Sequence, residues 1–291
     1  MSKRSRDCRT KNDIACNGRR ECLAVRSAAG FSTVLLTVMA AGFLLAQAAP
    51  PPVAAGYLRA ASPEFLPILP PAPAIGGSRD ASDRAIFRAT RSLEGSARWA
   101  MAQSDDNLSV RGLLSAFACS LGAALEPQSA PRLTALLSRV AIDADAAVAR
   151  VKEHYQRKRP FLVDEGPICL PRAGYLLTTF DYPSGHGALG WATGLLLAEI
   201  APGRAAGILA RARAFGDSRV ICGVHNASAV EAGRVAGAAL VAELHGSAAF
   251  RADLDRARRE FLTVGTRSPP KSEFCLTESA VVGLSLDSPV K

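Results

Sequence analysis

The chain has 291 residues, 48% of them hydrophobic, and a formal net charge of +9 at pH 7. This length allows one large domain or two small ones, and the apolar content supports a sizeable core. Residues 1–30 hold eight Lys or Arg and three acidic residues, so about +4 is left for the rest. Such a mild charge fits small anionic substrates better than a nucleic-acid groove, which needs clustered cations with aromatics. No glycine-rich phosphate loop of the P-loop or dinucleotide type occurs.

Residues 1–48 are typical of a secretory signal peptide with an extended basic n-region. The apolar run 31–46 ends at Ala46-Gln47-Ala48, which resembles a small-residue cleavage site. The run is too short, and too closely followed by Pro50, to favour a membrane span. Because the n-region is unusually long, we expect translation to start downstream, near Val25.

Residues 49–79 are rich in Pro and Ala and are expected to be irregular. From residue 80 to 262 the apolar residues follow helical spacing. No convincing strand alternation and no repeat is found. The predicted fold is therefore all-α, a single helical-bundle domain, and the polar segment 263–291 is expected to be a loose tail. The expected helices span 82–102 with a break at Gly95, 110–125, 131–155, 187–200, 204–215 and 227–245.

Four cysteines remain after removal of the signal peptide: Cys119, Cys169, Cys222 and Cys275. An even number in an exported chain indicates disulfides, and three pairings are possible. A buried thiol is an alternative for Cys222, since it lies on a predicted core helix. Neither the cysteines nor the histidines have the spacing of a metal site, so no metal is predicted.

The segment 181–225 holds two of the four histidines. Ser184-Gly185 is a typical helix N-cap, and the free N–H groups at such a start favour an anion beside His186. Upstream, Lys152 and Arg159 are seven residues apart, so on a helix they would share one face. Pro160 should end that helix at Arg159.

These pieces form three ordered motifs: Lys-x6-Arg-Pro, Pro-Ser-Gly-His and Ser-Arg-x5-His. They begin at Lys152, Pro183 and Ser218. Their order resembles the superfamily of type 2 phosphatidic acid phosphatases, vanadium haloperoxidases and bacterial class A non-specific acid phosphatases. The flanks, from about residue 67 to 245, look most like the class A acid phosphatases.

The resemblance implies a periplasmic, broad-specificity acid phosphatase that needs no metal or other cofactor. By position, His225 is the nucleophile that forms a phosphohistidine, and His186 protonates the leaving alcohol. The implied partners are small phosphomonoesters, with no nucleic acid, no membrane span after signal removal and possible homo-oligomers. The implied phosphate-binding residues are Lys152, Arg159, Ser184, Gly185 and Arg219, whereas Arg157 and Lys158 are expected not to matter for phosphate binding.

One departure from the family pattern concerns the residue four positions after His225. The family has an aspartate there that orients the histidine, and this chain has Ala229. Glu231 would lie about 240° away around a helix. A backbone carbonyl, a water, or a carboxylate such as Asp181 or Asp217 are the alternatives, and we expect Ala229→Asp to raise kcat/KM.

Two alternative functions are compatible with the sequence, and a third is disfavoured. Ala229 allows a weakened or catalytically silent phosphate-binding protein of the same fold. A vanadium-dependent haloperoxidase uses the same pocket, although the class A flanks argue against it. A membrane lipid phosphatase is disfavoured, because no apolar run after the signal peptide is long enough to span.

Overall fold

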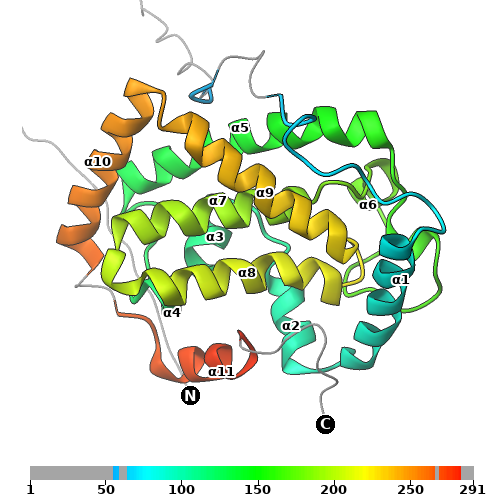
Figure 1. Cartoon of the computed structure of the whole chain (residues 1–291). Coiled ribbons are helices and arrows are strands. Elements are labelled where there is room, and N and C mark those ends of the chain that lie inside the picture. Colours follow the sequence, from blue (N-terminus) through cyan, green and yellow to red (C-terminus); the bar gives the residue numbers. More distant parts are fainter. Residues whose placement is uncertain (1–54, 59–63, 266–268, 283–291) are drawn as a thin grey trace, which may run out of the picture. The chain divides into compact units, whose positions relative to one another are not determined.

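The computed structural model describes residues 55–58, 64–265 and 269–282, and within them there are helices and no strands (Figure 1). The prediction of an all-α fold is confirmed. The α-helices are α1 Ser78–Thr90, α2 Ala97–Ser104, α3 Val110–Ala116, α4 Ala118–Leu121, α5 Pro131–Tyr155, α6 Tyr175–Thr178, α7 Gly185–Ile200, α8 Ala205–Ile221, α9 Ala227–Leu244, α10 Ala248–Val264 and α11 Ser272–Val282.

Helix α7 is the centre of the fold, packed between α8 and α9 and also against α5. Figure 1 shows α9 running obliquely across α7. Gly233 and Gly237 on α9 make this close crossing possible. A Cβ at Gly233 would lie 2.5 Å from the Ser184 carbonyl oxygen, and one at Gly237 would lie 2.4 Å from that of Ala188. Backbone-to-backbone packing thus fixes the start of α7, where the Ser-Gly-His motif lies.

Most predicted helices are present, with shifted ends. Helix α5 has the predicted bounds, and the predicted break at Gly95 falls between α1 and α2, with Gly95 at φ 77°. Helix α8 continues past Phe215 to Ile221, and the predicted helix 110–125 is divided at Phe117 into α3 and α4. Helix α10 was not predicted.

The expectation of a loose tail from residue 263 is wrong for residues 272–282. These form α11, which the disulfide Cys119–Cys275 ties to α4. Glu278 on α11 is buried and accepts from Arg211 Nε at 3.3 Å. A polar segment is held here by a covalent bond and a buried ion pair, which hydrophobic periodicity cannot indicate.

The second disulfide joins Cys169 to Cys222. The prediction of disulfides is thereby confirmed, and the alternative of a buried thiol at Cys222 is wrong. The Cys169 N–H also donates to the Cys222 carbonyl at 3.0 Å. The loop before α6 is therefore fastened to the end of α8, immediately before His225.

The signal peptide and the translation start fall outside the described residues. Residues 55–58 and 64–77 contain no helix, but they bury Phe65 and Leu69 in the core. Within the part of the chain that the structure describes, no helix combines the length and apolar character needed to cross a bilayer.

Candidate active site

A cavity of about 270 Å³ brings together side chains from all three motifs. Residues of α5, and of α6 with the segment after it, line this cavity. Two larger cavities border α11, and no histidine lines either one. The motif residues that line the smaller cavity are Lys152, Arg159, Gly185, His186 and His225.

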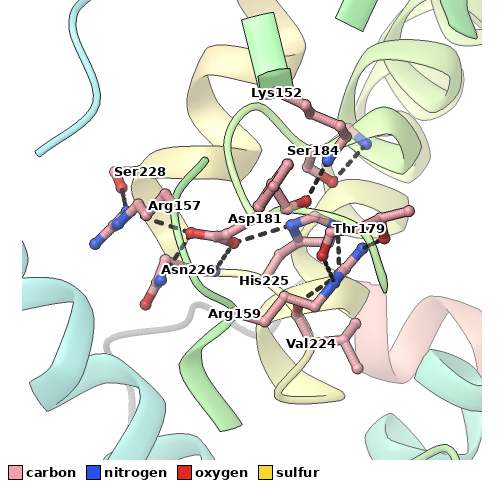
Figure 2. Close-up of polar contacts among 12 residues, drawn as sticks. Lys152, Arg157, Arg159, Thr179, Asp181, Ser184, Val224, His225, Asn226 and Ser228 are labelled. Carbon is pink, nitrogen blue, oxygen red and sulfur yellow. Dashed lines mark hydrogen bonds and ion pairs between the residues drawn. The ribbon is translucent and has the colours of Figure 1, made fainter. Parts of the chain in front are cut away.

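His225 is buried, and both of its ring nitrogens have partners. Nδ1 lies 3.0 Å from Asp181 Oδ1, and Nε2 lies 3.0 Å from Arg159 Nη1 (Figure 2). A guanidinium can only donate and a carboxylate only accepts, so Nδ1 carries the proton and Nε2 presents its lone pair. Burial, and then the charges of Arg159 and Lys152, lower the pKa of His225 well below its usual value. Because Nε2 accepts from a guanidinium and so carries no proton, the ring is neutral, as a nucleophile must be.

The turn that presents His225 is shaped by Gly223 and held by Arg91. Gly223 has φ 80°, and a Cβ there would lie 2.4 Å from Arg91 Nη1. Arg91 donates to the carbonyls of Val220 and Ile221 at the end of α8, at 3.1 and 2.7 Å. This cation satisfies carbonyls that a helix C-terminus leaves unpaired. Arg91 and the Cys169–Cys222 disulfide together hold the turn between α8 and His225 in place.

Asp181 supplies the carboxylate that Ala229 lacks. It is completely buried, and every described group on its oxygens is a donor: His225, Asn226 and Arg157. Asn226 donates from its backbone at 3.0 Å and from Nδ2 at 2.8 Å. Burial raises the pKa of Asp181, while Arg157 and Asn226 oppose that rise. Asp217, the other candidate, instead pairs with Arg213 and Arg234.

Arg157 contacts Asp181 and does not line the cavity, so it has a structural role that the expectation about phosphate binding did not cover. Its Nη1 lies 3.4 Å from Asp181 Oδ2 and donates to Ser228 Oγ at 2.8 Å (Figure 2). Its Nη2 donates to Asp80 and Asp83 at 3.0 and 2.9 Å. Arg157 thus joins α1, Asp181 and the first turn of α9 in one buried network.

Lys152 and Arg159 are the cations at the cavity, but they do not share a helix face. Helix α5 ends at Tyr155, because Gln156 adopts the left-handed conformation (φ 46°), and Arg159 lies in extended chain beyond it. The Lys152 Nζ donates to the Phe180 carbonyl at 2.5 Å, and Arg159 also donates to Thr179 and Val224. Burial, and then the charge of Arg159, lower the pKa of Lys152 to about 7.

The start of α7 supplies hydrogen-bond donors. Ser184 is its N-cap, accepts from the Gly187 N–H at 3.2 Å and donates its own N–H to the Ala229 carbonyl at 2.8 Å. Among the described residues, no backbone partner is found for the N–H of Gly185 or His186. These two N–H groups belong to residues that line the cavity, so the positive end of the helix dipole borders it.

His186 is buried and contacts a loop that follows α2. Its Nε2 lies 3.1 Å from the Asp106 carbonyl and 3.5 Å from Asp106 Oδ1. The carbonyl can only accept, so Nε2 carries a proton. Burial, and then the charge of Arg219, lower the pKa of His186, while Asp106 opposes this.

The structure places Arg219 behind the cavity. It is fully buried, with Nη1 2.7 Å from Asp106 Oδ1 and Nη2 donating to the Ala102 carbonyl. Its Nε is one of the few buried polar atoms of the described residues that have no partner. A phosphate oxygen that reached Nε would satisfy this donor.

Comparison with known proteins gives a consistent assignment. Residues 132–251 match the PAP2 superfamily model. An acid phosphatase of Zymomonas mobilis is 39% identical over 215 residues, which are 73% of this chain and 81% of that protein. A non-specific acid phosphatase of Providencia stuartii is 36% identical over 200 residues, 68% of this chain and 81% of its own length. The chain belongs to the acid phosphatases of the PAP2 superfamily. A non-specific acid phosphatase of Salmonella typhimurium is 34% identical over 194 residues, 66% of this chain and 78% of that protein.

Two residues at the site of this acid phosphatase were not predicted from the sequence. Asp106 and Tyr175 were not considered, yet the Tyr175 hydroxyl donates to Asp106 Oδ1 at 2.8 Å and the ring lines the cavity. Asp106 lies in the polar loop Ser104-Asp105-Asp106-Asn107, which looks like an ordinary interhelical turn. No local signal distinguishes it, because its partners are 69 to 113 residues away.

Proposed function

We propose that this acid phosphatase hydrolyses phosphate monoesters with broad specificity through a phosphohistidine on His225. The observation that carries the proposal is the unprotonated Nε2 of His225, which accepts from Arg159 and belongs to a ring that lines a cavity shared with Lys152, Arg159 and His186. The names of two relatives include the words non-specific acid phosphatase, which supports the broad specificity.

In the first step Arg159 transfers its hydrogen bond from His225 Nε2 to a phosphate oxygen, and Nε2 bonds to phosphorus as the bond from phosphorus to the ester oxygen breaks. The leaving oxygen takes a proton from His186, which becomes neutral. In the second step a water gives its proton to His186 and its oxygen bonds to phosphorus, so the bond to Nε2 breaks. This returns both histidines to their starting states and releases inorganic phosphate.

The charge on the transferred group would be stabilised by Lys152, Arg159 and the N–H groups at the start of α7. The Ser184 hydroxyl and Arg219 Nε are the further donors that we assign to phosphate. Orientation of His225 by Asp181 also stabilises the cation that forms when Nε2 is phosphorylated, since Nδ1 then donates to a carboxylate.

The pKa shifts of the two histidines favour activity at acid pH. His225 has to be neutral and His186 protonated, so activity needs a pH above the pKa of the first and below that of the second. Burial lowers both pKa values, and that of His225 lies well below its usual value. The window therefore lies below the ordinary histidine pKa of about 6.5.

Metal independence, localisation and binding partners are further parts of the proposed function. Within the described residues, no group of three or more His, Cys, Asp or Glu is placed to bind a metal. Metal independence stays a prediction, and full activity in excess EDTA would support it. Export to the periplasm by the signal peptide, action on small phosphomonoesters and not nucleic acid, and a possible homo-oligomer are likewise proposals.

The alternatives make different predictions in one assay. The alternative of a silent phosphate-binding protein was based on the missing aspartate at position 229. The contact of Asp181 with His225 argues against it, because Asp181 supplies a carboxylate at Nδ1. Purified protein should turn over p-nitrophenyl phosphate at acid pH, and His225→Ala should abolish this. Binding of phosphate without turnover would favour the silent protein, and halide oxidation only after addition of vanadate would favour the haloperoxidase.

His186 can be tested separately through the leaving group. His186→Ala should lose far more activity on alkyl phosphates than on p-nitrophenyl phosphate, because p-nitrophenolate leaves without a proton. An equal loss on both substrates would reject the general-acid role.

A further inference from the structure

Among the residues that the structure describes, Asp106 is the one carboxylate that touches both a proposed catalytic histidine and a proposed phosphate-binding cation. Its Oδ1 accepts from Arg219 Nη1 at 2.7 Å and from the Tyr175 hydroxyl at 2.8 Å. The same oxygen lies 3.5 Å from His186 Nε2, and the Asp106 carbonyl lies 3.1 Å from that nitrogen. Partial burial raises the pKa of Asp106, but the contact with His186 and the charge of Arg219 outweigh it and leave the pKa at about 2. Asp106 is thus ionised in the acid range.

The contact with Asp106 decides which nitrogen of His186 can give a proton. Nε2–H is held by the Asp106 carbonyl, and Nδ1 has no hydrogen-bond partner among the described residues. The proton that His186 transfers is therefore the one on Nδ1, and the imidazolium that carries it is adjacent to the Asp106 carboxylate. Removing that charge makes the imidazolium harder to form.

The charged and titratable groups around His186 come from several elements. Arg219 on α8 and Asp106 after α2 are the nearest, Tyr175 on α6 binds Asp106, and His225 acts on His186 across the cavity. Lys152 and Arg159 line the same cavity and are cationic, and the carboxylic acids Asp145 and Glu153 of α5 line it as well. Among these described groups, Asp106 is the carboxylate in contact with His186, and it favours the protonated ring by its charge.

The same charge has a cost for substrate binding. A phosphate is an anion, and a carboxylate paired with Arg219 both repels it and occupies one arm of the guanidinium. Only Nε of Arg219 is left without a partner.

We propose that Asp106 is a positioning residue of the reaction, which holds His186 as the proton donor and at the same time weakens phosphate binding. This inference rests on the proposed function and adds to it a residue with two opposite effects. If Asp106 only held the loop together, its loss would lower activity on all substrates alike. It would change neither the dependence on the leaving group nor the affinity for phosphate.

The test is Asp106→Asn, which keeps the shape of the side chain and removes its charge. We expect the inhibition constant of inorganic phosphate to fall about three- to tenfold, because one nearby negative charge is gone. We expect kcat for an alkyl phosphate to fall about tenfold near neutral pH, with the basic limb of its pH profile moved to lower pH. Turnover of p-nitrophenyl phosphate should change about threefold or less, since its leaving group needs little protonation.

A double variant separates the two effects. In a His186→Ala background, Asp106→Asn should still tighten phosphate binding but should no longer change the dependence on the leaving group. Asp255→Asn, an exposed carboxylate on α10, is the control for net charge and should change neither quantity. If Asp106→Asn does not fold, Asp106→Glu keeps the charge and should keep the wild-type inhibition constant within about twofold.

Equal loss on both classes of substrate, with the pH limb and the phosphate inhibition constant unchanged, would show that Asp106 only holds the loop. The inference would also be overturned if the phosphate inhibition constant fell in Asp106→Glu as far as it is expected to fall in Asp106→Asn. The effect would then not depend on the charge. Failure of the proposed function is distinguishable, because the wild type itself would then not turn over p-nitrophenyl phosphate.

Discussion

Asp181 Oδ1 lies 3.0 Å from His225 Nδ1, although the two residues are 44 positions apart in the chain. Asp181 precedes the Ser-Gly-His motif by three residues, so the carboxylate reaches His225 from the α7 side and not from α9. The position that the family pattern gives to an aspartate is used here for packing. Ala229 is fully buried, and its carbonyl accepts from the Ser184 N–H.

Asp181→Asn should lower kcat by about 10²- to 10⁴-fold, the range seen when a carboxylate that orients a histidine is removed. An amide can turn its NH₂ toward Nδ1 and so stabilise the wrong tautomer. KM should change much less, because Asp181 does not line the cavity. Steady-state kinetics with p-nitrophenyl phosphate measures both quantities, and Asp217→Asn, whose carboxylate pairs with Arg213 and Arg234, is the control.

Ala229→Asp should lower activity, the reverse of the expectation from sequence. Asp181 already binds Nδ1, and a second carboxylate at a fully buried position would have no counter-charge. Such a buried, unpaired charge destabilises a fold by about 3 kcal/mol or more. Thermal unfolding and kcat/KM measure the two losses.

The double variant Asp181→Ala/Ala229→Asp should be more active than Asp181→Ala alone. An i, i+4 spacing on one helix face would let the new carboxylate reach His225 once the first is absent. A double variant no more active than the single one would show that α9 is not placed to supply this carboxylate.

Arg157→Ala should reduce kcat by about tenfold, within the range for residues that orient a catalytic group indirectly. The loss arises because Asp181 and Asp83 would lose their shared cation. Lys158→Ala is the matched control: the neighbouring side chain is exposed, and its loss should be neutral. Equal activity of the two variants would contradict the role of Arg157.

Lys152 should make anion binding depend on pH near neutrality. Its pKa is about 7 in the free enzyme, so its charge is present below that pH and is lost as pH rises through it. An anion binds the charged form better, so affinity should fall with rising pH. Sulfate is a suitable ligand because it stays a dianion in this range. Lys152→Met should bind sulfate more weakly and lack this decline, and an identical decline in the variant would assign it to another group.

Much of the site could be predicted because it depends on local chemistry. The helix cap at Ser184 and the helix break at Gly95 follow from the local preferences of serine and glycine. The spacing of Lys152, His186 and His225 follows the family motifs. These predictions needed no knowledge of distant contacts.

The remainder depended on contacts between residues far apart in the chain. Asp181 could be named only as one of several possible partners of His225, and Arg157 was set aside because the family motif places the phosphate-binding arginine at Arg159. The Arg219–Asp106 pair joins residues 113 positions apart, and the local sequence around neither residue predicts the contact. Helix α10 is a different case, because its Phe250, Leu254 and Ala257 form a buried stripe that the sequence already contains.

The most direct test of the central claim is the identity of the phosphorylated nitrogen. Wild-type enzyme mixed with ³²P-labelled substrate and quenched with base within one turnover should carry label on His225 at Nε2, because Asp181 occupies Nδ1. Alkaline digestion and separation of the two phosphohistidine isomers identify the nitrogen, and His225→Ala should carry no label. Label on Nδ1 of His225, or on any other residue, would contradict the mechanism.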